Sequence, residues 1–362
     1  MRIIAHLDMD AFFASLEEAG SEIFRGKPIV VGSDPKDGQG RGVVSTANYK
    51  AREYGIKSAL PISRAWELSQ KAKKEGKPEA IFVQPDFERY NKAHDEILGT
   101  IKKYCDLVEP ASIDEFYFDL SFLEKKPAEG WDYAVELCKK IKKEIKEKLK
   151  VTCSVGIGPN KLIAKIAAGI KKPDGLFLVE ADEAEKFLEL LPIREIPGIG
   201  PKTEKLFNDK GVKIVKDLKG FSKEELKEAL GKWGEALYSK IRAIDDSPIV
   251  ENREVKSIGE QATFPCDSRD FIYIGQVFEN LCKGVFKSFL QSGFKEFKTV
   301  VIVVRFSDFE TKTTAKTLKN FTGKEKEFRL ETMKLLLPYF DKRKNPRRKL
   351  IRLIGVRLEK LK

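Results

Sequence analysis

Strand-like and helix-like segments alternate along the first part of the chain, and this order limits the folds that it can adopt. Residues 2–10 are mostly apolar and predict a β-strand, followed by helical spacing through Leu16 and Glu17. Residues 107–120 hold two strand-like runs joined by a short turn, which indicates an antiparallel pair. Further strands are expected at 28–32, 42–45 and 151–157, and further helices at 46–54, 86–105, 131–149 and 160–170. The pattern predicts an α+β fold with a mixed sheet.

The pattern changes after residue 182. Residues 182–244 show only helical spacing, with glycine-bearing turns between short helices. Residues 243–255 (AIDDSPIVENREV) are acidic and lack periodicity, so we interpret them as an interdomain linker. The remainder predicts strands and helices in a β-α-β-β-α-β order, at 257–264, 271–292, 299–306, 311–318, 324–339 and 350–358. A chain of 362 residues is long enough for two to four domains, at roughly 150 residues each.

The net charge of +12 is concentrated in the last third of the chain. Residues 251–362 hold 25 Lys and Arg against 14 Asp and Glu, a balance of +11, whereas the first 250 residues have a balance of +1. This excess favours a polyanionic partner, most simply nucleic acid, although a solubilising surface gives the same count.

Several classes of site are excluded by composition. The five cysteines lie far apart without a C-x-x-C pair, and there are two histidines, so neither a zinc site nor histidine-based catalysis is expected. No P-loop, dinucleotide-binding fingerprint or Ser/His/Asp arrangement is found. No apolar stretch reaches the roughly 18 residues of a membrane span, and no signal peptide is recognised. We therefore expect no membrane partner and a cytoplasmic location.

Two pairs of acidic residues lie in apolar surroundings, where an unpaired carboxylate is costly. Asp8 and Asp10 end the first strand and share a face, because side chains alternate along a strand. Asp114 and Glu115 lie at the turn or the start of a strand within 107–120. If the strands are neighbours, the carboxylates converge, and oxygen ligands suit Mg²⁺. Two Mg²⁺ ions about 3.5–4 Å apart can catalyse a phosphoryl displacement. The alternative is that these acids cap turns or pair with lysines.

Three cationic or phenolic residues could bind phosphate. Tyr49 and Arg52 are three positions apart on a predicted helix and so lie on one face. Lys161 begins another helix after a Gly-Pro turn, where the helix N-terminus favours anions. The alternative for each is a solvated surface position.

Residues 196–206 (IPGIGPKTEKL) have the pattern of a helix–hairpin–helix turn. Gly198 and Gly200 would let the backbone approach a DNA phosphate, with Lys202 as a further donor. An ordinary turn between helices is the alternative. A weaker second copy is found at residues 230–234 (LGKWG), where a packing turn is equally consistent.

Four segments resemble the successive motifs of Y-family translesion DNA polymerases, most closely DNA polymerase IV and its archaeal counterparts. They are Asp8–Ser15 (DMDAFFAS), Ser45–Arg52 (STANYKAR), Ala111–Asp119 (ASIDEFYFD) and Ser154–Lys165 (SVGIGPNKLIAK). The resemblance implies a multidomain right hand with a palm, small fingers, a helical thumb with the helix–hairpin–helix, and a little finger. The implied boundaries are palm 1–19 and 83–175, fingers 20–82, thumb 176–242, linker 243–255 and little finger 256–362.

The resemblance also implies roles for individual residues. Asp8, Asp114 and Glu115, with the Met9 carbonyl, would be catalytic and hold two Mg²⁺ ions, whereas Asp10 matches the motif without being a usual ligand. The incoming dNTP would be bound by Thr46, Tyr49, Arg52, Lys161 and backbone N–H groups near Phe12 and Phe13. The Phe13 ring would be the steric gate that excludes a 2′-hydroxyl. Primer–template DNA would contact Gly198, Gly200, Lys202, Lys312, Thr313, Lys316 and Arg352, although Leu353 replaces a second basic residue found in some relatives.

The implied activity is template-directed, low-fidelity translesion DNA synthesis by a nucleoid-associated monomer. A nuclease that uses the same two metals, or a DNA-binding scaffold without catalysis, are the alternatives. Relatives commonly end in a peptide that binds a sliding clamp. This sequence ends at Lys360-Leu361-Lys362 without one. Either the sequence is truncated, or a sliding clamp binds at another site, and both alternatives stay open.

Overall fold

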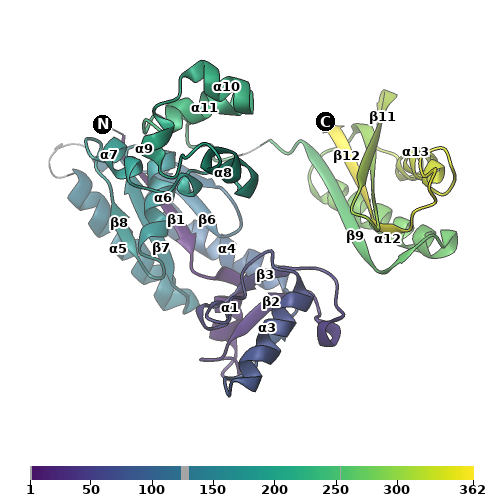
Figure 1. Ribbon diagram of the computed structural model, residues 1–362, viewed down its shortest axis with the longest axis horizontal. Coiled ribbons are helices and arrows are strands. Elements are labelled where there is room, and N and C mark those ends of the chain that lie inside the picture. Colours follow the sequence, from purple (N-terminus) through teal and green to yellow (C-terminus); the bar gives the residue numbers. More distant parts are fainter. Residues whose placement is uncertain (1, 124–129, 253) are drawn as a thin grey trace. The chain divides into compact units, whose positions relative to one another are not determined.

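The computed structural model describes residues 2–123, 130–252 and 254–362 (Figure 1). Residue 1, residues 124–129 of the predicted palm and residue 253 of the predicted linker lie outside the described residues. Contacts group the chain into two compact units. The first holds residues up to Asn252 apart from 40–42, and the second holds 40–42 with the rest of the chain.

The first unit contains a five-stranded sheet in the order β5-β6-β1-β7-β8. The strands are β1 (Ile4–Met9), β5 (Val108–Pro110), β6 (Glu115–Asp119), β7 (Cys153–Gly158) and β8 (Leu176–Leu178). β1 is antiparallel to both of its neighbours, whereas β7 and β8 are parallel. The predicted mixed sheet is confirmed, and β8 extends it past residue 175, where the thumb was expected to begin.

The helices of this part are α4 (Phe87–Lys102), α5 (Gly130–Leu149) and α6 (Lys161–Ile170). Alternate residues of β1 face different layers. Ala5 and Leu7 pack into the main hydrophobic core with α4 and α5, whereas Ile4 packs on the opposite face with α6 (Figure 1). Because side chains alternate, His6 and Asp8 lie on the face toward α6.

A smaller sheet follows α1 (Phe12–Gly20). Its order is β3-β2-β4, and its elements are β2 (Ile29–Gly32), β3 (Val44–Ala47), α2 (Tyr49–Arg52), α3 (Ile62–Lys74) and β4 (Ile81–Val83). The helix predicted over 46–54 is therefore shorter, because Thr46 and Ala47 pair with β2 as strand residues.

Residues 182–244, which were predicted to form a helical segment, follow β8 and contain five α-helices. These helices are α7 (Ala184–Glu189), α8 (Pro201–Asn208), α9 (Val215–Leu218), α10 (Lys223–Leu230) and α11 (Lys232–Lys240), around a separate hydrophobic core. Short 3-10 turns lie at Ile193–Glu195 within this segment, and at Lys36–Gly38, Ser121–Leu123 and Leu337–Tyr339 in other parts of the chain.

The first part of the predicted linker is bound to the first unit. The Asp245 carboxylate accepts a hydrogen bond from the Leu162 backbone N–H at 3.0 Å. Ile249 is 8% exposed and packs with Ile4, and the Val250 N–H donates to Glu109 at 2.9 Å. The segment up to Val250 is therefore docked, although its sequence lacks periodicity.

The second unit is a four-stranded antiparallel sheet in the order β11-β10-β12-β9. Its elements are β9 (Ser257–Ser268), α12 (Phe271–Gln291), β10 (Phe297–Phe306), β11 (Thr311–Thr322), α13 (Glu325–Leu336) and β12 (Ile351–Leu361). Both helices pack on one face of the sheet. The predicted β-α-β-β-α-β order is confirmed. Within the described ranges of the whole chain, no helix combines the length and hydropathy of a membrane-spanning segment.

Candidate active site

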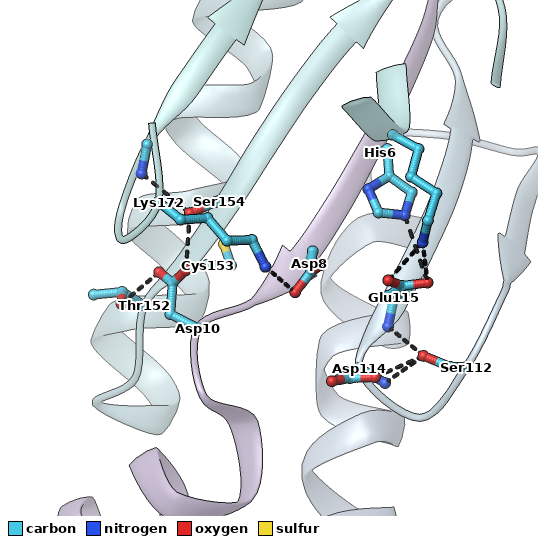
Figure 2. Close-up of polar contacts among 12 residues, drawn as sticks. His6, Asp8, Asp10, Ser112, Asp114, Glu115, Thr152, Cys153, Ser154 and Lys172 are labelled. Carbon is cyan, nitrogen blue, oxygen red and sulfur yellow. Dashed lines mark hydrogen bonds and ion pairs between the residues drawn. The ribbon is translucent and has the colours of Figure 1, made fainter. Parts of the chain in front are cut away.

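Neighbouring strands bring the predicted carboxylates together. The register of β1 and β6 places Asp8 directly opposite Glu115. The Met9 N–H donates to the Asp114 carbonyl oxygen at 3.0 Å, so Asp114 lies at the same end of the strand pair. Figure 2 shows these side chains together at that end. The strand pairing that the sequence analysis required is confirmed.

Lysines neutralise two of the three carboxylates. Lys172 forms an ion pair with Asp8 (Figure 2). Lys165 of α6 donates to both Glu115 oxygens at 2.7 Å. Neither lysine was assigned a role from the sequence. Lys165 lies four residues after Lys161 and so shares its helix face, which was a usable signal, whereas nothing in the spacing marks Lys172.

The two carboxylates differ in how well their charge is compensated. Burial raises the pKa of Asp8 to about 6, although Lys172 opposes this rise. The pKa of Glu115 falls to about 2 because His6 and then Lys165 favour its charged form against burial. His6 Nε2 lies 3.8 Å from Glu115 Oε2. Asp8 is therefore the carboxylate that gains most from an additional positive charge.

Asp114 is oriented by Ser112, which the sequence analysis did not single out. The Ser112 hydroxyl donates to Asp114 Oδ1 at 2.6 Å, and its oxygen accepts from the N–H groups of Asp114 (3.3 Å) and Glu115 (3.1 Å). One side chain thus holds the turn that carries both acids.

The donor chemistry fits a hard divalent cation. Among residues 2–123, 130–252 and 254–362, no three His, Cys, Asp or Glu side chains already have metal-binding spacing. At Asp8 and Glu115 the ammonium groups act as counter-ions instead. The residues still fit Mg²⁺, because they offer carboxylate oxygens and because burial raises the pKa of Asp8 to about 6, so that an added cation would favour its charged form.

The N-terminus of α1 lies immediately after this strand end and has no side-chain cap. Ala11 has a φ of +47° and turns the chain sharply from β1 into the helix. The N–H groups of Phe12 and Phe13, at the first turn, have no intrahelical acceptor. This helix end therefore favours an anion.

The predicted phosphate-binding residues of the small sheet lie close together. Tyr49 and Arg52 are the ends of α2, and the guanidinium lies 4.8 Å from the ring centroid. Thr46 precedes them in β3. The Tyr49 hydroxyl is buried close to the Asp10 carboxylate and has no hydrogen bond of normal geometry among the described residues. Burial and then the Asp10 charge raise the pKa of Tyr49 to about 12. A buried hydroxyl without a well-formed hydrogen bond is a natural contact for a ligand.

The Phe13 ring is held by aromatic packing. It stacks on Tyr90 of α4 with ring centroids 4.2 Å apart and an interplanar angle of 11°. Phe87 meets it edge-on at 5.9 Å. The Tyr90 hydroxyl donates to the buried Glu17 carboxylate at 2.8 Å. Tyr90 and Glu17 thus fix the ring, and neither was assigned a site role from the sequence.

Lys161 lies apart from the three carboxylates. Its ammonium donates to the buried Glu109 at 2.6 Å and lies 4.6 Å from the Tyr117 ring centroid. The structure therefore brings Lys165 and Lys172, rather than Lys161, to Asp8 and Glu115. The phosphate-binding role of Lys161 stays a prediction.

The helix–hairpin–helix turn requires a glycine at its first position. Gly198 has a φ of +104°, and a Cβ there would lie 2.7 Å from the Trp233 ring. Gly200 is the N-cap of α8 with open space around it, and Lys202 is exposed in the first turn. The turn thus presents backbone N–H groups and a lysine to solvent.

The predicted DNA contacts of β11 do not share a face. Lys312 pairs in register with Val304 and Lys316 with Val300, both core residues, so these lysines lie on the helix-covered side. Lys316 forms an ion pair with Glu331 of α13. Thr313 lies on the opposite face of the sheet, as strand alternation requires.

Arg352 lies at the start of β12 on an irregular part of the ladder. Its guanidinium lies 4.6 Å from the Phe309 ring centroid and 3.7 Å from Asp267. Its contact with DNA, like those of Lys312, Thr313 and Lys316, stays a prediction.

Three family profiles match the chain. They are the impB/mucB/samB family over residues 7–169, the DNA polymerase-iota thumb domain over 194–245, and the impB/mucB/samB C-terminal domain over 255–362. A protein from Methanosarcina mazei named DNA polymerase IV 2 is 36% identical over 361 residues, 100% of this chain and 93% of the relative. DNA polymerase IV from Methanoculleus marisnigri is 38% identical over 360 residues, 99% of this chain and 94% of the relative.

Solved structures of Y-family polymerases are also similar to this chain over nearly its whole length. The Y-family DNA polymerase chimera Dbh-Dpo4(243-245)-Dbh is similar with a TM-score of 0.85 and 30% identity over 99% of both chains. The insertion ternary complex of Dbh DNA polymerase has a TM-score of 0.68 and 30% identity, again over 99% of both chains. The resemblance of the four motifs, and with it the expected fold class, is confirmed. The chain belongs to the Y family of translesion DNA polymerases.

Proposed function

We propose that this polymerase extends a DNA primer by transferring nucleotides from dNTPs, at low fidelity and across damaged templates. The observation that carries the proposal is the register pairing of Asp8 with Glu115, next to Asp114 and the uncapped N-terminus of α1. One strand pair and one helix end thereby supply both the carboxylates and the anion site that nucleotidyl transfer needs. We further propose that the protein is a monomer that binds primer–template DNA and dNTP. It would act in the cytoplasm, in association with the nucleoid.

Family membership implies dependence on a divalent metal ion. We propose that Asp8, Asp114 and Glu115, with the Met9 carbonyl, hold two Mg²⁺ ions. Bound there, the ions would lower the pKa of the primer 3′-hydroxyl and stabilise negative charge at the reacting phosphate.

The chain's own residues would bind and orient the nucleotide. The N–H groups of Phe12 and Phe13, the Tyr49 hydroxyl and the Arg52 guanidinium can donate to the triphosphate. Lys172, which already lies beside Asp8, is a further phosphate donor that we add to this set. Phe13 would exclude a 2′-hydroxyl, because Tyr90 supports its ring from behind.

Two further surfaces fit DNA. The helix–hairpin–helix turn at Gly198, Gly200 and Lys202 exposes backbone donors and a cation. In the second unit, the sheet face opposite the two helices carries Thr313 and is not covered by either of them. A sliding clamp is a further proposed partner, for which the described surface gives no specific contact.

Primer extension tests the proposed metal ligands. Asp114→Ala should abolish dNTP-dependent lengthening of a primer in Mg²⁺, because it removes a ligand for the reacting centre. Its affinity for primer–template should change little, because Asp114 does not belong to either proposed DNA surface. Asp132→Ala, an exposed acid in the first turn of α5, is the matched control and should extend primers normally.

The same assay separates the rival functions. A nuclease would shorten the primer without dNTP, and an inactive scaffold would bind DNA without changing its length. Normal synthesis by Asp114→Ala would refute the metal assignment.

A further inference from the structure

Asp10 is a buried carboxylate that the proposed chemistry leaves unused. Its side chain is 1% exposed and follows directly after β1. Oδ1 accepts a hydrogen bond from the Ser154 hydroxyl at 2.8 Å. Oδ2 accepts from the Thr152 hydroxyl at 2.8 Å and from the backbone N–H of Asp174 at 2.7 Å (Figure 2 shows the two hydroxyl contacts). One carboxylate thus ties the end of β1 to the start of β7 and to the segment before β8.

The segment that Asp10 holds is a tight turn that carries Lys172. Asp174 has a φ of +54°, and a Cβ on Gly175 would lie 2.1 Å from the Lys171 carbonyl oxygen. The Gly175 N–H donates to the Ser154 hydroxyl oxygen at 3.3 Å, so Ser154 connects Asp10 to the turn a second time. Within this turn only Lys172 reaches the carboxylate set, through its ion pair with Asp8.

The chemistry of the contacts explains why an acid is suited to this position. A carboxylate is purely an acceptor, and the Asp174 N–H can only donate. Asparagine could keep its oxygen on Thr152 and Asp174 and direct its amide to the Ser154 oxygen, which can accept. Alanine would leave a buried backbone N–H without a partner, which is costly. Asp10→Asn therefore removes the charge but can keep the hydrogen bonds, whereas Asp10→Ala removes both.

We propose that Asp10 is a positioning residue that fixes the Lys172 turn, so that the Lys172 ammonium meets the phosphates of the incoming nucleotide beside Asp8. The inference rests on the proposed phosphate contact of Lys172. Asp10 itself touches neither the nucleotide nor the reacting atoms. Its influence on the nucleotide passes through the turn.

A double-mutant cycle on the KM for dNTP tests this route. Lys172→Ala should raise the KM on the order of tenfold or more, as expected for a lost charge-assisted hydrogen bond. Asp10→Ala should raise it by a similar factor. In the Lys172→Ala background, Asp10→Ala should add about twofold or less, because residues that act through one contact are not additive. If the two factors multiply, Asp10 does not act through Lys172 and the inference is wrong.

Two conservative substitutions, one at Asp10 and one at a residue that donates to it, distinguish a positioning role from a general loss of folding. Asp10→Asn should restore the KM toward the wild-type value, and failure to do so would overturn the positioning role. Thr152→Val removes one donor with little change in shape, and it should raise the KM a fewfold, with the same dependence on Lys172. A KM that stays unchanged, or an increase that persists in the Lys172→Ala background, would contradict the inference.

A control variant and a competing route through Tyr49 test whether the effect is specific to Lys172. Thr100→Val removes a buried hydroxyl of α4 that donates to the Glu96 carbonyl at 2.8 Å, and it should leave the KM unchanged. A parallel cycle with Tyr49→Phe covers the other phosphate donor close to Asp10, and coupling to Tyr49 instead of Lys172 would overturn the assigned route. If Lys172→Ala alone leaves the KM for dNTP unchanged, the proposed contact of Lys172 with the nucleotide phosphates is wrong, and this inference is wrong with it. If Lys172→Ala raises the KM and the cycle is additive, the inference alone fails.

Discussion

The Phe13 ring is constrained by its neighbours rather than by the backbone alone. Tyr90 lies parallel to it at 4.2 Å, Phe87 covers its edge, and Glu17 fixes the Tyr90 hydroxyl. A ring supported in this way cannot retreat to admit a larger sugar. Selection against ribonucleotides is therefore expected to depend on packing.

Phe13→Ala should admit ribonucleotides. Removing the ring opens space where a 2′-hydroxyl would otherwise clash, and the preference for dNTP over rNTP should fall by roughly 10- to 100-fold. The ratio of kcat/KM for the two nucleotides in primer extension measures this. Phe122→Ala, an exposed aromatic residue at 53% exposure, is the control. Undiminished sugar discrimination in Phe13→Ala would remove the gate assignment.

At the residue level, the convergence of the carboxylates could be predicted because their residue type conflicts with its surroundings. Asp8 and Glu115 stand out because carboxylates are rare in apolar strands. Lys172 carries no such signal, because lysines are common and its approach to Asp8 depends on a turn that pairs with distant residues. Lys316 shows a different case: the family resemblance implies a DNA contact, which stays a prediction, and the structure adds an ion pair with Glu331 that strand alternation alone does not reveal.

At the level of elements, the predicted order agrees with the structure in most of the chain. The elements that were missed include the 13-residue helix α3, and also β4 and β8, which are three-residue strands with no local period to detect. β8 exists because β7 offers it a parallel edge, with the Val155 N–H donating to the Gly175 carbonyl oxygen at 3.0 Å. Such pairing is a tertiary interaction that a short apolar run cannot reveal.

The helix–hairpin–helix turn provides a matched pair of glycine variants. Gly198→Ala forces a side chain into φ +104° and against Trp233, so it should destabilise the first unit by roughly 1–3 kcal/mol and weaken duplex binding. Gly200→Ala meets no atom within 4 Å and should cost less than about 1 kcal/mol.

Denaturant unfolding and primer–template binding measure the two effects of these variants. Equal stability of Gly198→Ala and Gly200→Ala would contradict the described turn. Unchanged DNA binding by a folded Gly198→Ala variant would argue against its DNA contact.

For the whole molecule, net charge indicates the partner but not the surface that meets it. Many cations of the basic second unit are already paired, as in Lys316–Glu331, Arg329–Glu279 and Lys349–Asp308. The count of basic residues therefore predicts nucleic acid, while the contacts decide which lysines remain for phosphate.

Primer–template affinity should fall steeply with salt, because each phosphate contact releases counter-ions. If Lys202 contacts a phosphate, Lys202→Ala should reduce the slope of log K against log salt by about 0.9. Lys139→Ala, which removes an exposed cation of α5 paired with Glu136 at 2.6 Å and outside the proposed DNA surfaces, should leave the slope unchanged. A flat salt response of the wild-type protein would be inconsistent with binding through basic residues.

The docked start of the linker also limits how far the two halves of the enzyme can separate. With Ile249 and Val250 held on the first unit, the seven residue steps from Val250 to Ser257 span at most about 25 Å when fully extended. A tether of this length keeps each half at an effective concentration in the millimolar range around the other. If each half binds the template as proposed, a template released by one half stays within reach of the other, so residence on DNA should exceed what either half achieves separately.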